Sequence, residues 1–143
     1  PYIEELTPIF ADSLLFRINK NRGLGSFIKN KPVFMPIPLH WYKKHLRGFN
    51  QTELMAKSLS KLLDLPFMDI LERVKYTKPQ SELSEKERQE NVENIFKIKA
   101  NFKAPSSVIL FDDVWTTGST LKNATKILKK EGVKEVWALT LAR

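Results

Sequence analysis

The chain has 143 residues, of which 42% are hydrophobic, and carries a formal net charge of +8. We expect a single soluble globular domain with a sizeable core, because no apolar run approaches the ~20 residues needed to span a bilayer. The absence of cysteine excludes both a disulfide framework and a thiolate metal site within this chain.

The predicted elements alternate between helices and strands. Apolar periodicity and helix-end signals give, in chain order, a helix over 8–21, a strand over 32–37, a helix over 51–63, two ribbon arms over 70–76 and 95–99, a buried strand over 108–111, a helix opening near 119 and a strand over 133–142. Gly23 lies beyond the end of the first helix, and Gly132 closes the last one. Asn50 and Glu53 have the spacing of a capping box for the second helix.

The positive charge is concentrated in one segment. No Asp or Glu occurs between Ser13 and Thr52, whereas the cations there equal the whole net charge: Arg17, Lys20, Arg22, Lys29, Lys31, Lys43, Lys44 and Arg47. Such a region attracts either a pyrophosphate group or a nucleic-acid backbone. A solvated basic surface that only maintains solubility is an equally good interpretation. Composition alone leaves all three open.

A basic and aromatic loop lies within this segment, between the strand over 32–37 and the following helix. Arg47 can form two parallel hydrogen bonds to a phosphate, and the backbone N–H groups from Gly48 to Gln51 can add anion contacts at the helix end. Arg47 can equally pair with a nearby acid. We interpret His40 and His45 as surface or core histidines rather than catalytic bases.

A long polar connection joins the two arms of the predicted ribbon. Connections of this kind are often lids over a site. Ser84 and Glu87 form a second capping box, which indicates a short helix within the connection. Arg88 on that helix could reach a bound pyrophosphate, and the alternative is a charged loop without a function.

The segment from Val108 to Thr120 carries the most information about function. Its four leading apolar residues predict a strand buried on both faces, so Asp112 and Asp113 follow at the carboxyl end. Ligands of parallel α/β sheets bind at that edge. The turn after the acids, residues 116–120, offers hydroxyls, one glycine and the N-terminus of a helix, which suit a phosphate.

Two carboxylates beside a phosphate site need a different role, since they repel the anion. They can accept hydrogen bonds from vicinal hydroxyls or hold the water shell of Mg²⁺. The combination indicates a phosphorylated ribose. The alternative is a buried strand that ends in a helix cap, with Asp112 and Asp113 merely solvated.

The same segment resembles the 5-phosphoribosyl-1-pyrophosphate (PRPP) signature of type I phosphoribosyltransferases, an apolar strand followed by two acids and a Thr-Thr-Gly-x-Thr loop. The resemblance implies that Asp112 and Asp113 contact the ribose hydroxyls. It places the 5′-phosphate against Thr116, Thr117, Gly118, Ser119 and Thr120. Trp115 departs from the pattern, because that position is more often small or aliphatic.

Two further blocks resemble the ComF family of phosphoribosyltransferase-like proteins, which many bacteria use in competence for DNA uptake. One block is Arg47, Gly48, Phe49, Asn50 and Gln51; the other comprises Arg73, Thr77, Gln80, Leu83, Arg88 and Asn91. The resemblance runs from about Pro32 to the end. ComF proteins usually begin with a small cysteine-containing zinc module, which this chain lacks. The chain also begins at Pro1 without an initiator methionine, so we expect a fragment or processed form, and we find no signal peptide.

The resemblance implies a type I phosphoribosyltransferase fold: a mostly parallel twisted sheet flanked by helices, with a flexible lid. We expect one domain, with a helical segment over 1–31, a PRPP-binding core over 32–143 and a lid over about 77–94. PRPP or another ribose 5-phosphate compound is the implied ligand. Mg²⁺ is the implied cofactor, held by Asp112 and Asp113 through water.

The implied activity is transfer of 5-phosphoribosyl from PRPP to an unidentified acceptor, with Asp112, Asp113 and Arg47 as the catalytic residues. The alternative is a non-catalytic module that senses PRPP or binds single-stranded DNA, for which Trp41, Tyr42 and Phe49 would stack on bases. Competence proteins and a second copy of the chain are the further partners considered. The expected location is the cytoplasm, and the sequence does not identify the acceptor.

Overall fold

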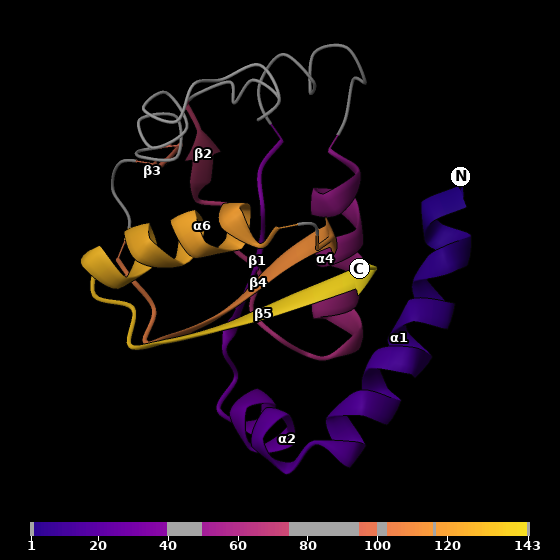
Figure 1. Ribbon diagram of the computed structural model, residues 1–143. Coiled ribbons are helices and arrows are strands. Elements are labelled where there is room, and N and C mark those ends of the chain that lie inside the picture. Colours follow the sequence, from indigo (N-terminus) through magenta and orange to yellow (C-terminus); the bar gives the residue numbers. More distant parts are fainter. Residues whose placement is uncertain (1, 40–49, 75–94, 100–102, 116, 143) are drawn as a thin grey trace.

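The computed structural model describes residues 2–39, 50–74, 95–99, 103–115 and 117–142, with the side chains of residues 2–7 left aside. Figure 1 shows helices on both sides of a twisted sheet. The described elements are α1 (Tyr2–Lys20), α2 (Arg22–Lys29), β1 (Val33–Pro36), α4 (Gln51–Leu62), β2 (Leu71–Arg73), β3 (Phe96–Ile98), β4 (Ser107–Val114), α6 (Ser119–Lys130) and β5 (Glu135–Ala142).

Strand β4 is the centre of a parallel three-stranded sheet in the order β1-β4-β5. Val108 pairs with Val33 on one side and with Val136 on the other. The four apolar residues 108–111 are at most 3% exposed, which confirms the predicted burial on both faces. A parallel strand between two others has helices over each face, so both sets of its side chains enter a core.

Each face of the sheet has its own core cluster. Alternate residues of β4 point to opposite faces, so Val108 and Leu110 pack with Leu121, Ala124 and Leu128 of α6. The other face packs against α1, α2 and α4, through Ala11, Leu14, Phe27, Met55, Ala56, Leu59, Phe34, Ile109 and Phe111. These two layers fix the strand ends relative to the helix ends around them.

Strands β2 and β3 form an antiparallel ribbon, with Leu71 opposite Ile98 and Arg73 opposite Phe96. This confirms the predicted pairing of the two arms. Leu71 and Phe96 belong to the core cluster on the α6 face, so the ribbon is anchored to the sheet. The predicted lid over 77–94 lies outside the described residues.

The N-terminal helices differ from the prediction. Helix α1 begins at Tyr2 and includes Pro8, whereas the prediction started the helix at that proline. Ala11 and Leu14 anchor the helix by burial, although a proline inside a helix lacks an N–H for the ladder.

Helix α2 was not predicted, because Gly23 was interpreted as a helix stop. The Leu24 N–H donates to Asn21 Oδ1 at 3.0 Å, so Asn21 caps a second helix directly after the first. Phe27 then stacks on Trp137 of β5 with ring centroids 5.2 Å apart. The cap and this tertiary contact together outweigh the low helix propensity of Gly23 and Gly25.

Helix α4 begins where the sequence predicts, with Asn50 as its N-cap. The capping box is only partly confirmed, because the Asn50 side chain makes no capping hydrogen bond. The Leu54 N–H donates to the Asn50 carbonyl at 3.1 Å, and the side chain is buried, with 5% of the residue exposed. Among the described residues Asn50 Oδ1 has no hydrogen-bond partner, so the buried side chain does not make the expected contact with the first turn.

Candidate functional site

The helices α4 and α6 cover opposite faces of the sheet, but both begin near the edge where β1 and β4 have their carboxyl ends (Figure 1). The Ile37 N–H donates to the Phe111 carbonyl at 2.8 Å, which carries the pairing of these strands up to this edge. Asp112 and Asp113 follow within β4, whose last residue is Val114. Acids predicted for the edge of a buried strand therefore lie there.

The surroundings of Asp112 disfavour its ionised form. Burial, and then the charge of neighbouring Asp113, raise the pKa of Asp112 to about 7. The Asp113 N–H donates to Asp112 Oδ1 at 3.0 Å, which works in the opposite direction and favours the ionised form. A pair in this state gains from hydroxyl donors or a cation, because either would compensate the second negative charge.

The turn between β4 and α6 has the geometry of an anion site. Gly118 is the N-cap of α6 and has a left-handed φ of 73°, which disfavours side chains. Thr117 Oγ1 accepts from the Ser119 N–H at 3.3 Å and lies 2.9 Å from Ser119 Oγ. The first turn contains no acid, and the first N–H groups of a helix have no partner within it. Phosphate suits this end of α6.

Trp115 determines the shape of this turn. Its indole ring lies against Gly118 so closely that a Cβ at Gly118 would be 2.8 Å from Trp115 Cζ2. The Trp115 N–H donates to the Ala142 carbonyl of β5 at 2.8 Å, and its ring packs on the core cluster of the α6 face. Trp115, the residue that departs from the signature, therefore packs against the glycine turn and supports its conformation.

The structure brings part of the predicted site together. The two acids lie at the end of β4, and the turn residues follow a few positions later at the start of α6: Thr117, Gly118, Ser119 and Thr120. Asn50 and Gln51 stand at the start of α4, near the same edge of the sheet (Figure 1). Other predicted residues lie outside the described part of the chain: Arg47, Gly48, Phe49, Arg88 and Thr116.

Arg73 of β2 is a charged neighbour of the site to which sequence reasoning assigned no role. Its positive charge lowers the pKa of Asp112, opposing burial. Burial lowers the pKa of Arg73 itself, and the charge of Asp112 raises it. The guanidinium carbon lies 6.0 Å from the ring centroid of Phe96 on β3. The ComF pattern contained Arg73, but only the packing of the ribbon on the sheet brings it near Asp112.

We expect Arg73→Gln to raise the pKa of Asp112 further above about 7, because the substitution removes a cation that favours its ionised form. Carboxyl titration by NMR measures this pKa. Arg73→Lys keeps the positive charge and serves as the matched control, in which the pKa stays closer to that of the wild type. An unchanged pKa in Arg73→Gln contradicts the coupling.

The site fits Mg²⁺ only if the protein carboxylates share the ion with a bound substrate and water. Among the described residues, no cluster of three His, Cys, Asp or Glu side chains forms a complete protein cage for a metal. Asp112 and Asp113 supply two carboxylates, and a bound cation would lower the raised pKa of Asp112 by favouring its ionised form. Mg²⁺ is usually bound through one or two carboxylates together with substrate phosphates and water, which this edge can accommodate.

Comparisons with known proteins agree with this geometry. Residues 51–143 match the phosphoribosyl transferase domain. Competence protein F of Haemophilus influenzae is 40% identical over 119 residues, which cover 81% of this chain and 52% of the relative. The chain belongs to the ComF family of phosphoribosyltransferase-like proteins. Within this family it is also similar to competence protein ComFC of Streptococcus pneumoniae, at 33% identity over 77% of the chain and 47% of the relative.

A third relative is the DNA utilization protein YhgH of Escherichia coli K12, 32% identical over 88% of the chain and 56% of the relative. The chain thus spans about half the length of the curated relatives it matches. Among the described helices, none combines the length and apolar character that a membrane span requires.

Solved structures confirm the type I phosphoribosyltransferase fold. A hypoxanthine phosphoribosyltransferase from Staphylococcus aureus superposes with a TM-score of 0.53 at 15% identity, over 96% of this chain and 62% of that one. The Trypanosoma cruzi hypoxanthine phosphoribosyl transferase gives a TM-score of 0.54 at 10% identity, over 96% and 64% of the two chains. Likeness at this level of identity concerns the fold alone.

Proposed function

We propose that this ComF-family chain binds PRPP at the edge formed by β4 and α6 and transfers its 5-phosphoribosyl group to an acceptor in the context of DNA uptake. One observation carries the proposal: two adjacent carboxylates and a glycine turn at a helix N-terminus occupy the end of the central strand, and burial together with Asp113 raises the pKa of Asp112. The phosphoribosyl transferase domain match and the competence names of relatives support it. The proposed location is the cytoplasm.

In this proposal the two halves of the site recognise different parts of the ligand. Asp112 and Asp113 accept hydrogen bonds from the ribose 2′ and 3′ hydroxyls, and these donors stabilise the ionised carboxylates. The 5′-phosphate is held by the N–H groups at the start of α6 and by the hydroxyls of Thr117 and Ser119. Thr116 and Thr120 complete this set by position in the signature.

The transfer step separates charge, and the site residues act where that charge develops. The bond from C1 to the pyrophosphate oxygen breaks, its electron pair leaves with pyrophosphate, and a bond forms from the acceptor nitrogen to C1. Arg47 and the N–H groups of residues 48–51 hold the departing pyrophosphate, while Asp112 and Asp113 fix the sugar. Mg²⁺, held by Asp112 and Asp113 through water, would supply positive charge that stabilises the departing pyrophosphate. A lid over 77–94 carrying Arg88 would exclude water during the step.

Turnover is tested by pyrophosphate release from PRPP with Mg²⁺ and a panel of nitrogen nucleophiles, including ammonia, free nucleobases and single-stranded DNA. The proposal predicts release that depends on one acceptor and that is lost in Asp112→Asn with Asp113→Asn. If PRPP binds but no acceptor gives release, the chain binds PRPP without acting as a transferase.

A second function, binding of single-stranded DNA, is favoured by the basic segment. Five cations of this segment are exposed residues on or beside α1 and α2: Arg17, Lys20, Arg22, Lys29 and Lys31. The aromatic residues Trp41, Tyr42 and Phe49 lie outside the described part of the chain. A salt-sensitive affinity for a labelled oligonucleotide that persists in Asp112→Asn with Asp113→Asn would support this function.

A further inference from the structure

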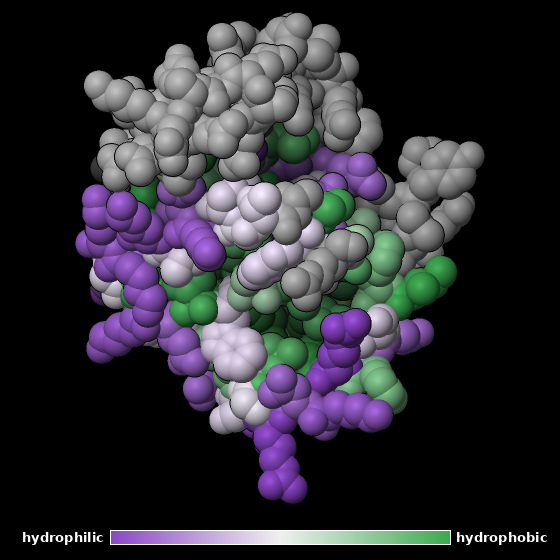
Figure 2. Space-filling model, in the orientation of Figure 1, coloured by the Kyte–Doolittle hydropathy of each residue, from purple (hydrophilic) through white to green (hydrophobic). Residues whose placement is uncertain are grey.

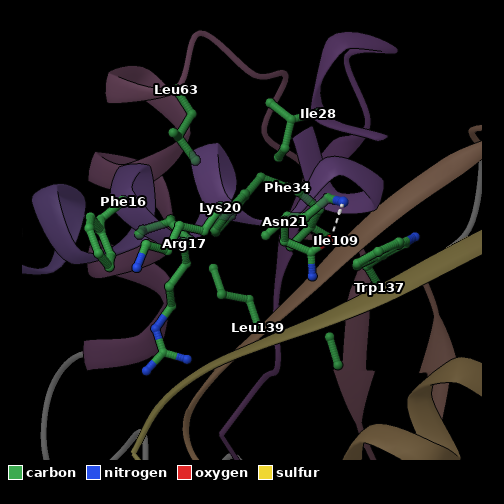
Figure 3. Close-up of a pocket in the computed structure, with 13 residues that line it drawn as sticks. Phe16, Arg17, Lys20, Asn21, Ile28, Phe34, Leu63, Ile109, Trp137 and Leu139 are labelled. Atoms are coloured by element: carbon green, nitrogen blue, oxygen red, sulfur yellow. Dashed lines mark hydrogen bonds between the residues drawn. The ribbon is translucent and has the colours of Figure 1, made fainter. Parts of the chain in front are cut away.

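A cavity of about 390 Å³ opens on the α1 face of the sheet, among residues that the proposed PRPP site does not use. Its floor consists of Ile109, Leu139 and Trp137, and its walls come from α1 and α2 and from Leu63 after α4. The volume is typical of ligand pockets. In Figure 2 the lower part of the molecule shows a green hollow between purple side chains, and Figure 3 shows the lining residues.

The mouth of this cavity is positively charged. Arg17 and Lys20 project from α1, opposite the apolar side chains of the sheet (Figure 3). The lining contains no Asp or Glu, and neither cation forms an ion pair with a described residue. The Lys20 amine lies 4.6 Å from the ring centroid of Phe16, which also lines the cavity and is 60% exposed. An apolar occupant with negative charge at its ends fits this arrangement.

Strand β5 adds hydrogen-bonding groups beside the cavity. Among the described strands it pairs only with β4, so its other edge presents free N–H and C=O groups next to lining residues 137–139. The strand has eight residues, and after Glu135 it contains no charge and no proline. Natural sheets usually protect long apolar edges with lysine, proline or a bulge. Such an edge is a template for another chain in extended conformation.

We propose that the cavity and the free edge of β5 bind an extended acidic peptide of a partner protein. The peptide pairs its backbone with β5, and every second side chain points to the α1 face. A large apolar side chain enters the cavity against Leu139 and Ile109, and neighbouring Asp or Glu side chains meet Arg17 and Lys20. Backbone pairing favours a peptide over a nucleic acid, because only a peptide provides the matching row of N–H and C=O groups.

The test is selection of a random peptide library on the immobilised full chain, followed by fluorescence anisotropy of the enriched peptides. We expect enriched sequences with apolar residues at alternate positions beside Asp or Glu. Arg17→Glu with Lys20→Glu should weaken binding about tenfold or more, since both charges oppose the peptide. Phe16→Ala should weaken it about threefold or more by removing exposed apolar area, with little effect on folding.

Lys103→Glu with Lys130→Glu makes the same charge change away from the cavity lining, and binding should stay within about twofold of the wild type. Four results would overturn the proposal. In the first, the library yields no such peptides, and in the second, the control variant weakens binding as much as the cavity variant does. In the third, oligonucleotides and not peptides occupy the cavity. In the fourth, sedimentation reveals a dimer that Phe16→Ala dissociates, so that a second copy of the chain is the occupant.

Discussion

Asp112→Asn is expected to make the protein more stable at pH 8 while removing a group that the proposed ribose contact needs. The pKa of Asp112 is raised from 3.8 to about 7 in the folded chain, so folding there disfavours the ionised carboxylate. As the pH rises from about 4 to about 7, the unfolded chain releases this proton first and the free energy of unfolding falls. Asparagine cannot ionise, and its Oδ1 can still accept the Asp113 N–H.

The expected gain in the free energy of unfolding at pH 8 is about 1–2 kcal/mol, after allowance for solvent screening of a partly exposed group. The gain should shrink as the pH falls towards 4 and vanish below about pH 3, where the wild-type carboxyl is protonated in both states. Urea denaturation at several pH values measures the difference. Asp12→Asn, on an exposed part of α1, makes the same change in charge and should shift stability by less than about 0.5 kcal/mol. A gain independent of pH would contradict the account.

Gly118→Ala should destabilise the turn at the start of α6 for two separable reasons. The left-handed φ of 73° strains any side chain, and the new Cβ would meet Trp115 Cζ2 at 2.8 Å. We expect a loss of about 1–3 kcal/mol in the free energy of unfolding, measured by urea denaturation. PRPP affinity should fall about tenfold or more, because displacement of the turn moves the N–H groups that hold the phosphate.

Gly132→Ala separates the two effects. Gly132 also has a positive φ, 98°, but nothing lies within 4 Å of the position a Cβ would occupy. This variant should show the backbone strain with unchanged PRPP affinity. Trp115→Ala in the Gly118→Ala background should recover part of the affinity by removing the clash. If Gly118→Ala and Gly132→Ala behave alike, Trp115 does not support the turn.

Both pairs of experiments concern the same property of the site. The buried carboxyl of Asp112 and the left-handed backbone of Gly118 each lower the stability of the folded chain. Both lie where the proposed ligand would contact the chain. Sites of this kind are often less stable than their substituted variants, because ligand binding and not folding selects their residues. A more stable but inactive Asp112→Asn protein would be one instance.

The sequence was sufficient to predict the elements that local patterns specify. The apolar run 108–111 predicted a strand buried on both faces, since a half-exposed strand alternates with polar residues. Gly132 ended α6 as expected, with a positive φ of 98°. The order of acids and turn residues then followed from the strand end, because parallel strands present their carboxyl ends at one edge.

Features that depend on tertiary packing were not predictable. Helix α2 is stabilised by the Asn21 cap and the stacking of Phe27 on Trp137, a residue far away in the sequence. Arg73 acts on Asp112 only because the β2–β3 ribbon packs on the α6 face. The cavity on the α1 face is lined by residues of α1, α2 and β5, which are far apart in the sequence, so no local motif predicts it.

The most direct test of the central proposal is isothermal titration calorimetry of the full chain with PRPP and Mg²⁺. The account predicts saturable binding to the wild type and a loss of about a hundredfold or more in Asp112→Asn with Asp113→Asn, since both carboxylates lose the charge that strengthens their hydrogen bonds to the ribose hydroxyls and attracts Mg²⁺. Asp12→Asn should bind as the wild type does. A wild-type chain that fails to bind PRPP, or a double variant that binds it equally well, would contradict the assignment of this edge as a PRPP site.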